Sequence, residues 1–256
     1  MELNYHRSGS GPTLIILHGL FGSWENWRAQ IKKLAEHYDV IAPDLRNHGG
    51  SPHAEEIDYA LMADDLIELM DRLGIEQALL LGHSMGGKVA MQLALEHPSR
   101  VQKLIVADIA PVAYGDHHQE VFQGLFNVDL AQLRSRADAD AQLAEYIDSA
   151  AVRAFLLKNL QRSRDGVFSW KMHLQALYDS YQNISAAPSA EGQYDGPVLF
   201  IKGGASDYLL PQHAAAIKAR FPHAQYKIID GAGHWLHAEK PAAFNRLLER
   251  FLSAKA

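Results

Sequence analysis

The chain reads A-L-L-L-G-H-S-M-G-G-K from Ala78 to Lys88. Its first part, Ala78–Leu81, is a short apolar run of the kind that forms a buried strand, and the spacing that follows predicts a helix over Met85–His97. Ser84 therefore falls on a tight strand-to-helix turn, with glycine two residues before and after it. A Cβ at either glycine would collide with neighbouring backbone. This pattern is typical of a nucleophile elbow, and the alternative is a serine that only caps a helix.

Further apolar runs of strand length alternate with stretches of helical spacing along the chain. The other predicted strands are Thr13–Leu17, Val40–Ala42, Leu104–Ala107, Val198–Ile201 and Tyr226–Ile229. The other predicted helices are Trp24–His37, Leu61–Leu73, Gln212–Arg220 and Pro241–Leu252. This alternation predicts an α/β fold with a mostly parallel sheet flanked by helices, in which each of these strands is buried.

One interval, residues 111–194, breaks the alternation because it contains no strand-like run. Its pattern is helical, as in Ala141–Leu160, with turn residues at Arg164–Gly166. We interpret 111–194 as a helical cap inserted into an α/β core of residues 1–110 and 195–256. The interval is rich in aromatic residues that we expect to face the core or a pocket, among them Tyr114, Phe122, Phe155, Trp170 and Tyr178.

Composition and charge exclude several classes of protein. The chain has 256 residues, of which 48% are hydrophobic and 21% charged, so it is neither disordered, collagen-like nor a coiled coil. Its 24 basic and 30 acidic residues give a net charge of −6, and a nucleic-acid partner would need a basic face. The run Leu14–Leu17 is far too short to span a membrane, and no signal peptide precedes it. We expect a cytoplasmic protein with neither nucleic-acid nor membrane partners, while its oligomeric state is not predicted.

Two other kinds of site can be weighed against the nucleophile. Gly82–Lys88 also fits G-x-x-x-x-G-K, but a phosphate-binding loop needs Ser or Thr after the lysine, and this chain has Val89. The pair His117 and His118, together with His237, could suggest a metal, but no H-E-x-x-H or similar spacing supports one. With no cysteine in the chain, we expect no thiolate metal site, no disulfide and no cysteine nucleophile. No cofactor is expected either.

Partners for Ser84 come from two other turns. His234 follows the last predicted strand in G-A-G-H-W, where its imidazole can act as the general base. The segment H-G-L-F-G at His18–Gly22 ends the first strong strand, where a bend can turn backbone N–H groups toward the serine. We assign the oxyanion hole to the amides of Leu20 and Met85. The bulky neighbours of these residues, Phe21 and Trp235, are expected to contact substrate.

Two aspartates compete to orient His234. Asp108 ends the strand Leu104–Ala107, and Asp207 follows the strand Val198–Ile201 in G-A-S-D. Both satisfy the chain order Ser, Asp, His. The aspartate that lacks this role is expected to cap a turn or a helix.

Four segments together carry a resemblance to a known family. They are D-L-R-N-H-G-G-S at Asp44–Ser51, G-H-S-M-G-G-K at Gly82–Lys88, D-I-A-P at Asp108–Pro111 and A-G-H-W at Ala232–Trp235. In these motifs the chain resembles small bacterial serine carboxylesterases of the α/β-hydrolase superfamily, from about residue 12 to the C-terminus. The resemblance implies eight mostly parallel strands, or fewer because residues 1–12 leave little room for a first hairpin, and a helical cap after the sixth strand.

The same resemblance bears on the acid and on the reaction. In that subgroup the D-I-A-P aspartate often serves as the triad acid, whereas in the wider superfamily the acid usually follows the seventh strand, and we favour Asp108. The implied activity is hydrolysis of short- to medium-chain carboxylic esters through an acyl-enzyme. A thioesterase, a lactonase or a C–C bond hydrolase would use the same residues. Dehalogenases and epoxide hydrolases of similar fold use an aspartate nucleophile, so a serine at position 84 excludes these two reactions. A non-catalytic receptor is a distant alternative.

Overall fold

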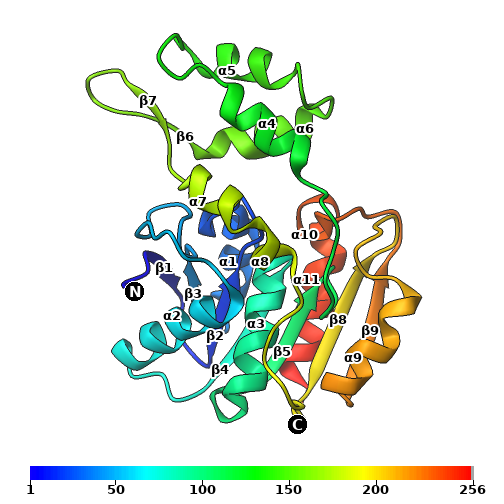
Figure 1. Ribbon diagram of the computed structural model, residues 1–256. Helices are drawn as coiled ribbons and strands as arrows, with labels where there is room; N and C mark the ends of the chain where they lie inside the picture. The colour runs from blue at the N-terminus through cyan, green and yellow to red at the C-terminus, as the bar shows by residue number, and fades with distance from the viewer. Residues whose placement is uncertain (255–256) are drawn as a thin grey trace.

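The computed structural model describes residues 1–254 and contains a seven-stranded main sheet (Figure 1). The strands are β1 (Tyr5–Ser8), β2 (Thr13–Leu17), β3 (Asp39–Pro43), β4 (Ala78–His83), β5 (Val101–Ala107), β8 (Val198–Gly203) and β9 (Ala224–Ile229). Their order is β1-β3-β2-β4-β5-β8-β9, and only β1 is antiparallel to its neighbour. The expected mostly parallel α/β sheet is confirmed. It has seven strands rather than eight, because the N-terminal segment supplies one strand, β1, and not a hairpin.

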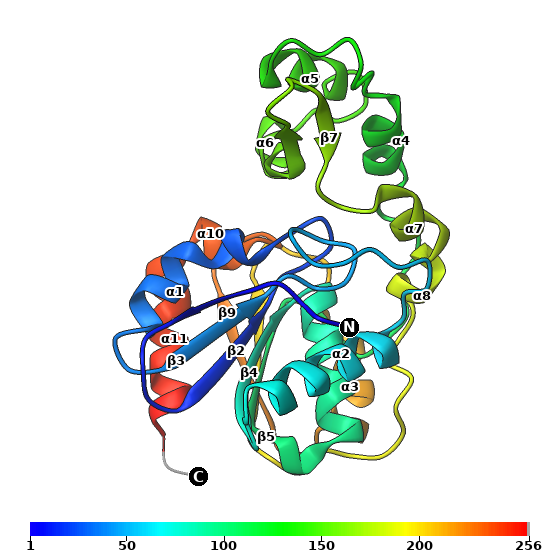
Figure 2. The same cartoon turned by 90° about the vertical axis from the view of Figure 1, so that its left-hand side faces the viewer.

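Two helical layers cover the sheet (Figure 2). One face is covered by α1 (Arg28–Leu34), which extends a 3-10 turn at Trp24–Trp27, and by α11 (Pro241–Ser253). The other face is covered by α2 (Tyr59–Arg72), α3 (Met85–Glu96) and α9 (Ala214–Arg220). Further short turns are the 3-10 segments Pro98–Arg100, Leu157–Asn159 and Pro211–His213 and the helix α10 (Leu236–Glu239).

The central strands are apolar throughout because both of their faces are covered. In β2, Leu14 and Ile16 pack into the core beneath α1 and α11, whereas Ile15 and Leu17 pack into the core beneath α2 and α3. Successive side chains of a strand point to opposite faces, so a continuous apolar run supplies both cores at once. The six strands predicted from such runs are all present.

The last strand, β9, departs from the prediction that it is buried. It forms the edge of the sheet and pairs only with β8. Tyr226 and Ile228 are 47% and 60% exposed. A short apolar run does not reveal whether its strand is central or at an edge, since that depends on what pairs beside it.

Between β5 and β8 the chain leaves the sheet and forms a further group of elements, most of which is seen above the core in Figures 1 and 2. This group contains α4 (Gln119–Asn127), α5 (Arg136–Leu143), α6 (Ala150–Leu156), a hairpin of β6 (Leu160–Arg162) and β7 (Phe168–Trp170), α7 (Leu174–Asp179) and α8 (Tyr181–Ser185). Among the helices of residues 1–254, none is both long and apolar enough to cross a membrane.

Two expectations for this interval were wrong. The helical pattern over Ala141–Leu160 is split, because α5 ends near Leu143 and Ser149 begins α6 by accepting a hydrogen bond from the Val152 amide. The interval also contains strands. The predicted turn at Arg164–Gly166 joins β6 to β7, with Gly166 in a left-handed conformation. Strands of three residues are too short to show a period of two in the sequence.

Candidate active site

The turn between β4 and α3 holds Ser84 in a strained backbone conformation. Its φ is 52° and its ψ is −121°, in a region that residues with side chains rarely adopt. The two flanking glycines make the turn possible, because a Cβ on Gly82 would lie 2.2 Å from the Gly86 carbonyl oxygen. A Cβ on Gly86 would lie 2.5 Å from the His18 carbonyl oxygen. The serine therefore projects from the carboxyl edge of the sheet, as its motif predicts.

His234 lies beside Asp108 and not beside Asp207. Its Nδ1–H donates a hydrogen bond of 2.8 Å to Asp108 Oδ2. The Asp108 carboxylate is fully buried, and it also accepts hydrogen bonds from the Gly203 amide at 2.9 Å and from the Ser206 hydroxyl. With the proton on Nδ1, the Nε2 lone pair of His234 is free to accept another proton.

Asp207 has a different environment, although it is only one residue from Ser206. Its side chain is exposed, and within residues 1–254 it forms neither a hydrogen bond nor an ion pair. The end of β8 and the turn after it thus contribute to the site through the Gly203 amide and the Ser206 hydroxyl, which the sequence analysis did not single out.

Ser84 and His234 line one cavity of about 370 Å³, together with Leu20, Phe21 and Trp235. The four residues predicted around the serine are therefore brought together, although in the described part of the chain Ser84 and His234 share no hydrogen bond. Such bonds are often long in an enzyme without substrate. The helix α6 covers this cavity with Val152, Phe155 and neighbouring residues.

The loop after β2 offers a backbone donor toward Ser84. In this loop the Phe21 amide donates to His48 Nε2 at 3.2 Å, and the Gly22 amide donates to the Gly19 carbonyl oxygen at 2.9 Å. Among residues 1–254 the Leu20 amide has no such acceptor. The same holds for the Met85 amide, because it lies at the first residue of α3. These two N–H groups are the ones assigned from the sequence.

Two buried histidines hold this loop, and sequence reasoning gave neither of them a role. His18 donates from Nδ1 to the Gly19 carbonyl oxygen at 2.8 Å and accepts from the Leu45 amide at 3.0 Å. His48 donates from Nδ1 to the Arg46 carbonyl oxygen at 2.9 Å. The available signals were the segment H-G-L-F-G, which contains His18, and the motif D-L-R-N-H-G-G-S, which contains His48 and supported the resemblance without any assigned function.

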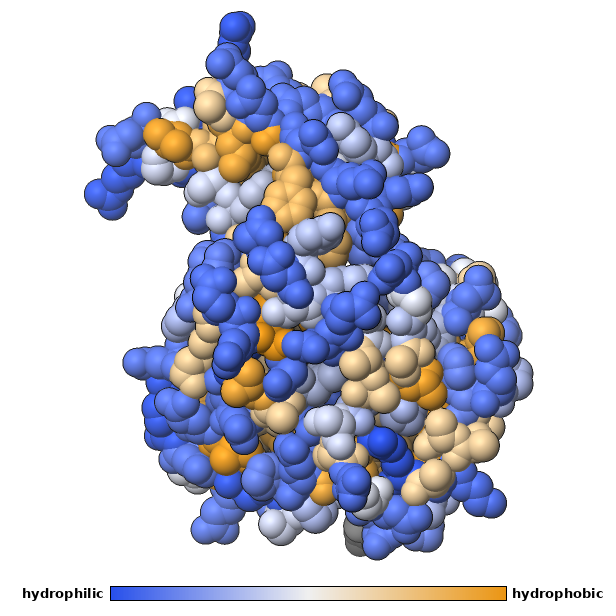
Figure 3. Space-filling model, in the orientation of Figure 1, coloured by the Kyte–Doolittle hydropathy of each residue, from blue (hydrophilic) through white to orange (hydrophobic). Residues whose placement is uncertain are grey.

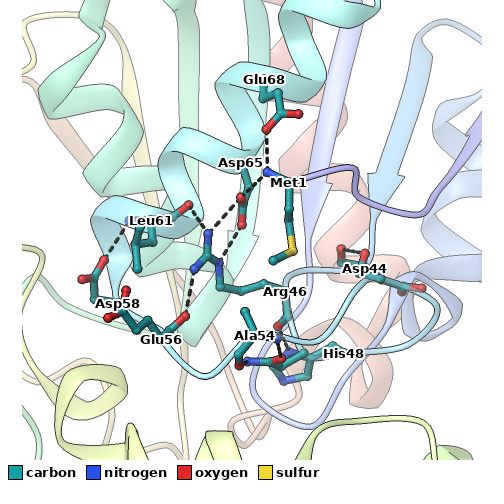
Figure 4. A network of polar contacts seen from close by, with 12 residues as sticks. Met1, Asp44, Arg46, His48, Ala54, Glu56, Asp58, Leu61, Asp65 and Glu68 are labelled. Atoms are coloured by element: carbon teal, nitrogen blue, oxygen red, sulfur yellow. Dashed lines mark hydrogen bonds and ion pairs between the residues drawn. The ribbon is translucent and has the colours of Figure 1, made fainter.

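A buried ion pair holds the segment that carries His48 (Figure 4). The Arg46 guanidinium donates to both oxygens of Asp65 on α2, at 2.7 and 2.9 Å, and to the Glu56 and Leu61 carbonyl oxygens. The N-terminal amine of Met1 also donates to Asp65, at 2.8 Å. A bidentate arginine that meets two further acceptors fixes the backbone around it. This network thus ties to α2 the segment whose His48 side chain holds the loop after β2.

A third buried histidine supports the segment that carries His234. His83 donates from Nε2 to the His234 carbonyl oxygen at 2.8 Å, and its ring lies 4.7 Å from that of His237. The His237 ring in turn stacks on Trp27 at 4.3 Å. Both histidines are structural neighbours of the site. Within residues 1–254 no group of three or more His, Asp or Glu side chains is arranged to hold a metal ion.

Burial lowers the pKa values of this set of histidines. The pKa falls to about 3 for His48 and His237 and to about 4 for His118, while the pKa values of His18 and His83 are also lowered. The cause in each case is first of all loss of hydration, which disfavours the charged imidazolium. These side chains therefore stay neutral in the folded protein well below the pH at which they take up protons in the unfolded chain.

We expect the protein to unfold cooperatively between about pH 6 and pH 4. Below about pH 6.5 the unfolded chain binds more protons than the folded one, so stability is lost as the pH falls. Each of the three histidines His48, His118 and His237 contributes roughly 1.4 kcal/mol per pH unit, so about two units would remove roughly 8 kcal/mol of a typical stability of about 5–15 kcal/mol. Circular dichroism and urea unfolding across this range measure the effect.

A variant and a contrary outcome accompany this acid-unfolding prediction. The His237→Gln variant should take up about one proton fewer on unfolding than the parent. Its unfolding free energy should therefore change less steeply with pH, by roughly 1.4 kcal/mol per pH unit. Native circular dichroism that persists at pH 3.5 would show that the buried histidines do not control acid stability.

Comparison with known proteins places this arrangement in a family. The family model for the alpha/beta hydrolase fold matches residues 12–241. A protein of Haemophilus influenzae named putative esterase/lipase is 40% identical over 94% of this chain and 83% of its own length. A Mus musculus protein named sn-1-specific diacylglycerol lipase ABHD11 is 38% identical over 94% of this chain and 81% of its own length.

A solved structure agrees over the whole chain. A marine microorganism esterase has 40% sequence identity and a TM-score of 0.95, over 98% of this chain and 99% of that one. The strained turn at Ser84, the histidine after β9 and the parallel sheet therefore occur together in a chain that belongs to the α/β-hydrolase family.

Proposed function

We propose that this protein is a serine hydrolase that cleaves carboxylic esters. The observation that carries the proposal is the hydrogen bond of 2.8 Å between His234 Nδ1 and buried Asp108. It leaves Nε2 of His234 free in the cavity that Ser84 lines from its strained turn. The names of the relatives, esterase and lipase, support an ester as the substrate.

In the proposed reaction, Ser84 Oγ attacks the ester carbonyl carbon while His234 takes the serine proton. The Leu20 and Met85 amides donate hydrogen bonds to the developing oxyanion. Asp108 holds the imidazole and stabilises its protonated form. The C–O bond then breaks, His234 passes its proton to the departing alcohol, and water hydrolyses the acyl-enzyme by the same steps in reverse.

Residues 111–194 serve in this proposal as the cap of a core formed by 1–110 and 195–256. The cap contributes Val152 and Phe155 to the wall of the cavity, where Phe155 lies 5.3 Å from the ring of Trp235. Phe21 and Trp235 are the proposed substrate contacts of the core. The cytoplasmic location and the lack of a nucleic-acid partner stay predictions of the sequence.

Thioesters, lactones and C–C bonds beside a carbonyl could react on the same groups. A panel of esters, thioesters and lactones compared by kcat/KM tests which class is preferred, and treatment with EDTA should leave the rates unchanged. The rival function, a non-catalytic receptor, predicts no release of p-nitrophenol from p-nitrophenyl acetate. A burst of release that disappears in Ser84→Ala would exclude the receptor.

Acyl-chain length gives a further prediction. We expect p-nitrophenyl butyrate to be hydrolysed with a kcat/KM at least about 10-fold above that of p-nitrophenyl palmitate. Extra methylenes gain binding energy only while they fit a closed apolar site. The measurement uses both esters as monomers, below the concentration at which the palmitate aggregates. A higher value for the palmitate would contradict the short- to medium-chain assignment.

A further inference from the structure

Ser84 lies between two cavities of unequal size. The cavity of about 370 Å³ described above extends from Ser84 toward α10 and α6, where it is lined by His237 and Val152. A second cavity, of about 40 Å³, extends toward α2 and α8, where it is lined by Tyr59 and Ile184. In Figure 2, α10 and the pair α2 and α8 lie on opposite sides of the core. The two cavities share Leu20, Ser84 and His118.

The catalytic groups are divided between the cavities. His234 lines the larger cavity and not the smaller one, whereas Met85 lines the smaller cavity and not the larger one. Leu20, the other proposed oxyanion residue, lines both. The proton donor and one oxyanion donor thus stand on different sides of the nucleophile.

The chemistry assigns one half of an ester to each side. When the tetrahedral intermediate collapses, His234 must give its proton to the alcohol oxygen, so this oxygen has to face the cavity that His234 lines. The carbonyl oxygen is held by the Leu20 and Met85 amides, and the acyl chain takes the remaining direction. We propose that the larger cavity binds the alcohol part of the ester and that the smaller cavity binds the acyl chain, an assignment that rests on the proposed function.

The same division accounts for the second half-reaction. Once the alcohol has left, the larger cavity is vacant on the side of His234, and water can reach the acyl carbon there. His234 takes one proton of this water as its oxygen bonds to the acyl carbon. The bond from the acyl carbon to Ser84 Oγ then breaks, and the proton returns to the serine. The acyl chain need not move during either step.

The smaller cavity has walls that are held in place by their own polar groups. The Tyr59 hydroxyl donates to the Ile184 carbonyl oxygen, and the Tyr114 hydroxyl accepts from the Ala110 amide at 2.9 Å and donates to the Tyr208 carbonyl oxygen. Buried Lys88 donates to the Ser185 carbonyl oxygen at 3.0 Å. These bonds leave the aromatic rings and the aliphatic side chains as the surface that meets a ligand.

Size then defines the substrate class. One water-sized group occupies about 10–15 Å³ of cavity volume. The smaller cavity, of about 40 Å³, therefore accommodates roughly three such groups. That matches the tail of an acetyl, propionyl or butyryl group. The larger cavity has about nine times that volume. The structure thus points to short acyl esters of bulkier apolar alcohols.

The experiment compares two isomeric esters, hexyl acetate and ethyl hexanoate, which contain the same atoms and differ only in which side is long. We expect the kcat/KM for hexyl acetate to exceed that for ethyl hexanoate by at least about 10-fold, because each methylene that does not fit costs a factor of about 10 or more. A ratio of one or below would overturn the assignment of the cavities.

Two variants locate the effect. Ile184→Ala enlarges only the smaller cavity and should raise the kcat/KM for ethyl hexanoate about 10-fold relative to hexyl acetate. Val152→Phe narrows only the larger cavity and should lower the kcat/KM for hexyl acetate relative to that for ethyl acetate. Ratios measured on one preparation are independent of the folded fraction, and Ile184→Val serves as a milder change if the alanine variant folds poorly. Unchanged ratios in both variants would also overturn the proposal.

Failure of this inference is distinguishable from failure of the proposed function. Labelling of Ser84 by a fluorophosphonate together with a preference for ethyl hexanoate would leave a serine hydrolase whose acyl site is the larger cavity. If Ser84 is not labelled and ester cleavage persists in Ser84→Ala, the serine mechanism itself is excluded.

Discussion

Replacement of Ser84 by alanine should lower kcat on short acyl esters by about 10⁶, and His234→Ala should have a similar effect. The alanine removes the oxygen that forms the acyl-enzyme, and without His234 the remaining serine hydroxyl is a weak nucleophile. Because the two residues act as a unit, the double variant should be barely slower than either single one. Steady-state rates with p-nitrophenyl butyrate measure all three.

The control for this result is Ser99→Ala, which changes an exposed serine just beyond α3 and should leave kcat within about two-fold of the parent, as surface substitutions usually do. Fluorophosphonate labelling should occur in the parent and in the control but not in Ser84→Ala. Ser84→Ala that retains a tenth of the parent activity would eliminate Ser84 as the nucleophile.

The second large effect separates the two aspartates. Asp108→Asn should lower kcat by about 10⁴, because an NH₂ donor then replaces the oxygen Oδ2 that accepts the hydrogen bond from His234 Nδ1–H. The imidazole is then held in the wrong tautomer, and a neutral amide cannot stabilise the imidazolium. The substituted group is isosteric, and it keeps one oxygen that can accept from the Gly203 amide, which now bonds to Oδ1 at 2.9 Å. Circular dichroism should therefore show a folded protein.

Asp207→Asn is the matched control, since it makes the same chemical change on an exposed side chain one residue from Ser206. We expect kcat to stay within about two-fold of the parent, as for other surface substitutions. A severe loss in Asp207→Asn with little loss in Asp108→Asn would transfer the acid role to Asp207. Partial and comparable losses would mean that both carboxylates act on His234.

Local patterns in the sequence were sufficient for most of the fold. The continuous apolar runs at β2, β4 and β8 predict buried parallel strands because both faces of these strands meet a core. The glycines around Ser84 predict the turn because the steric requirement lies within five residues. Sequence alone thus determined the α/β sheet, the strand-to-helix turn at Ser84 and the position of His234 after the last strand.

Only the tertiary structure decided what depends on residues far apart in the chain. The exposure of β9 at the sheet edge, the β6–β7 hairpin and the partner of His234 are of this kind. Asp108 and Asp207 satisfy the same order along the chain, but the end of β5 points its carboxylate to His234 while the turn after β8 leaves Asp207 in solvent. The supports from His18, His48 and His83 likewise join segments that only folding brings together. A hydrogen bond depends on distance in space, which a pattern of neighbouring residues does not contain.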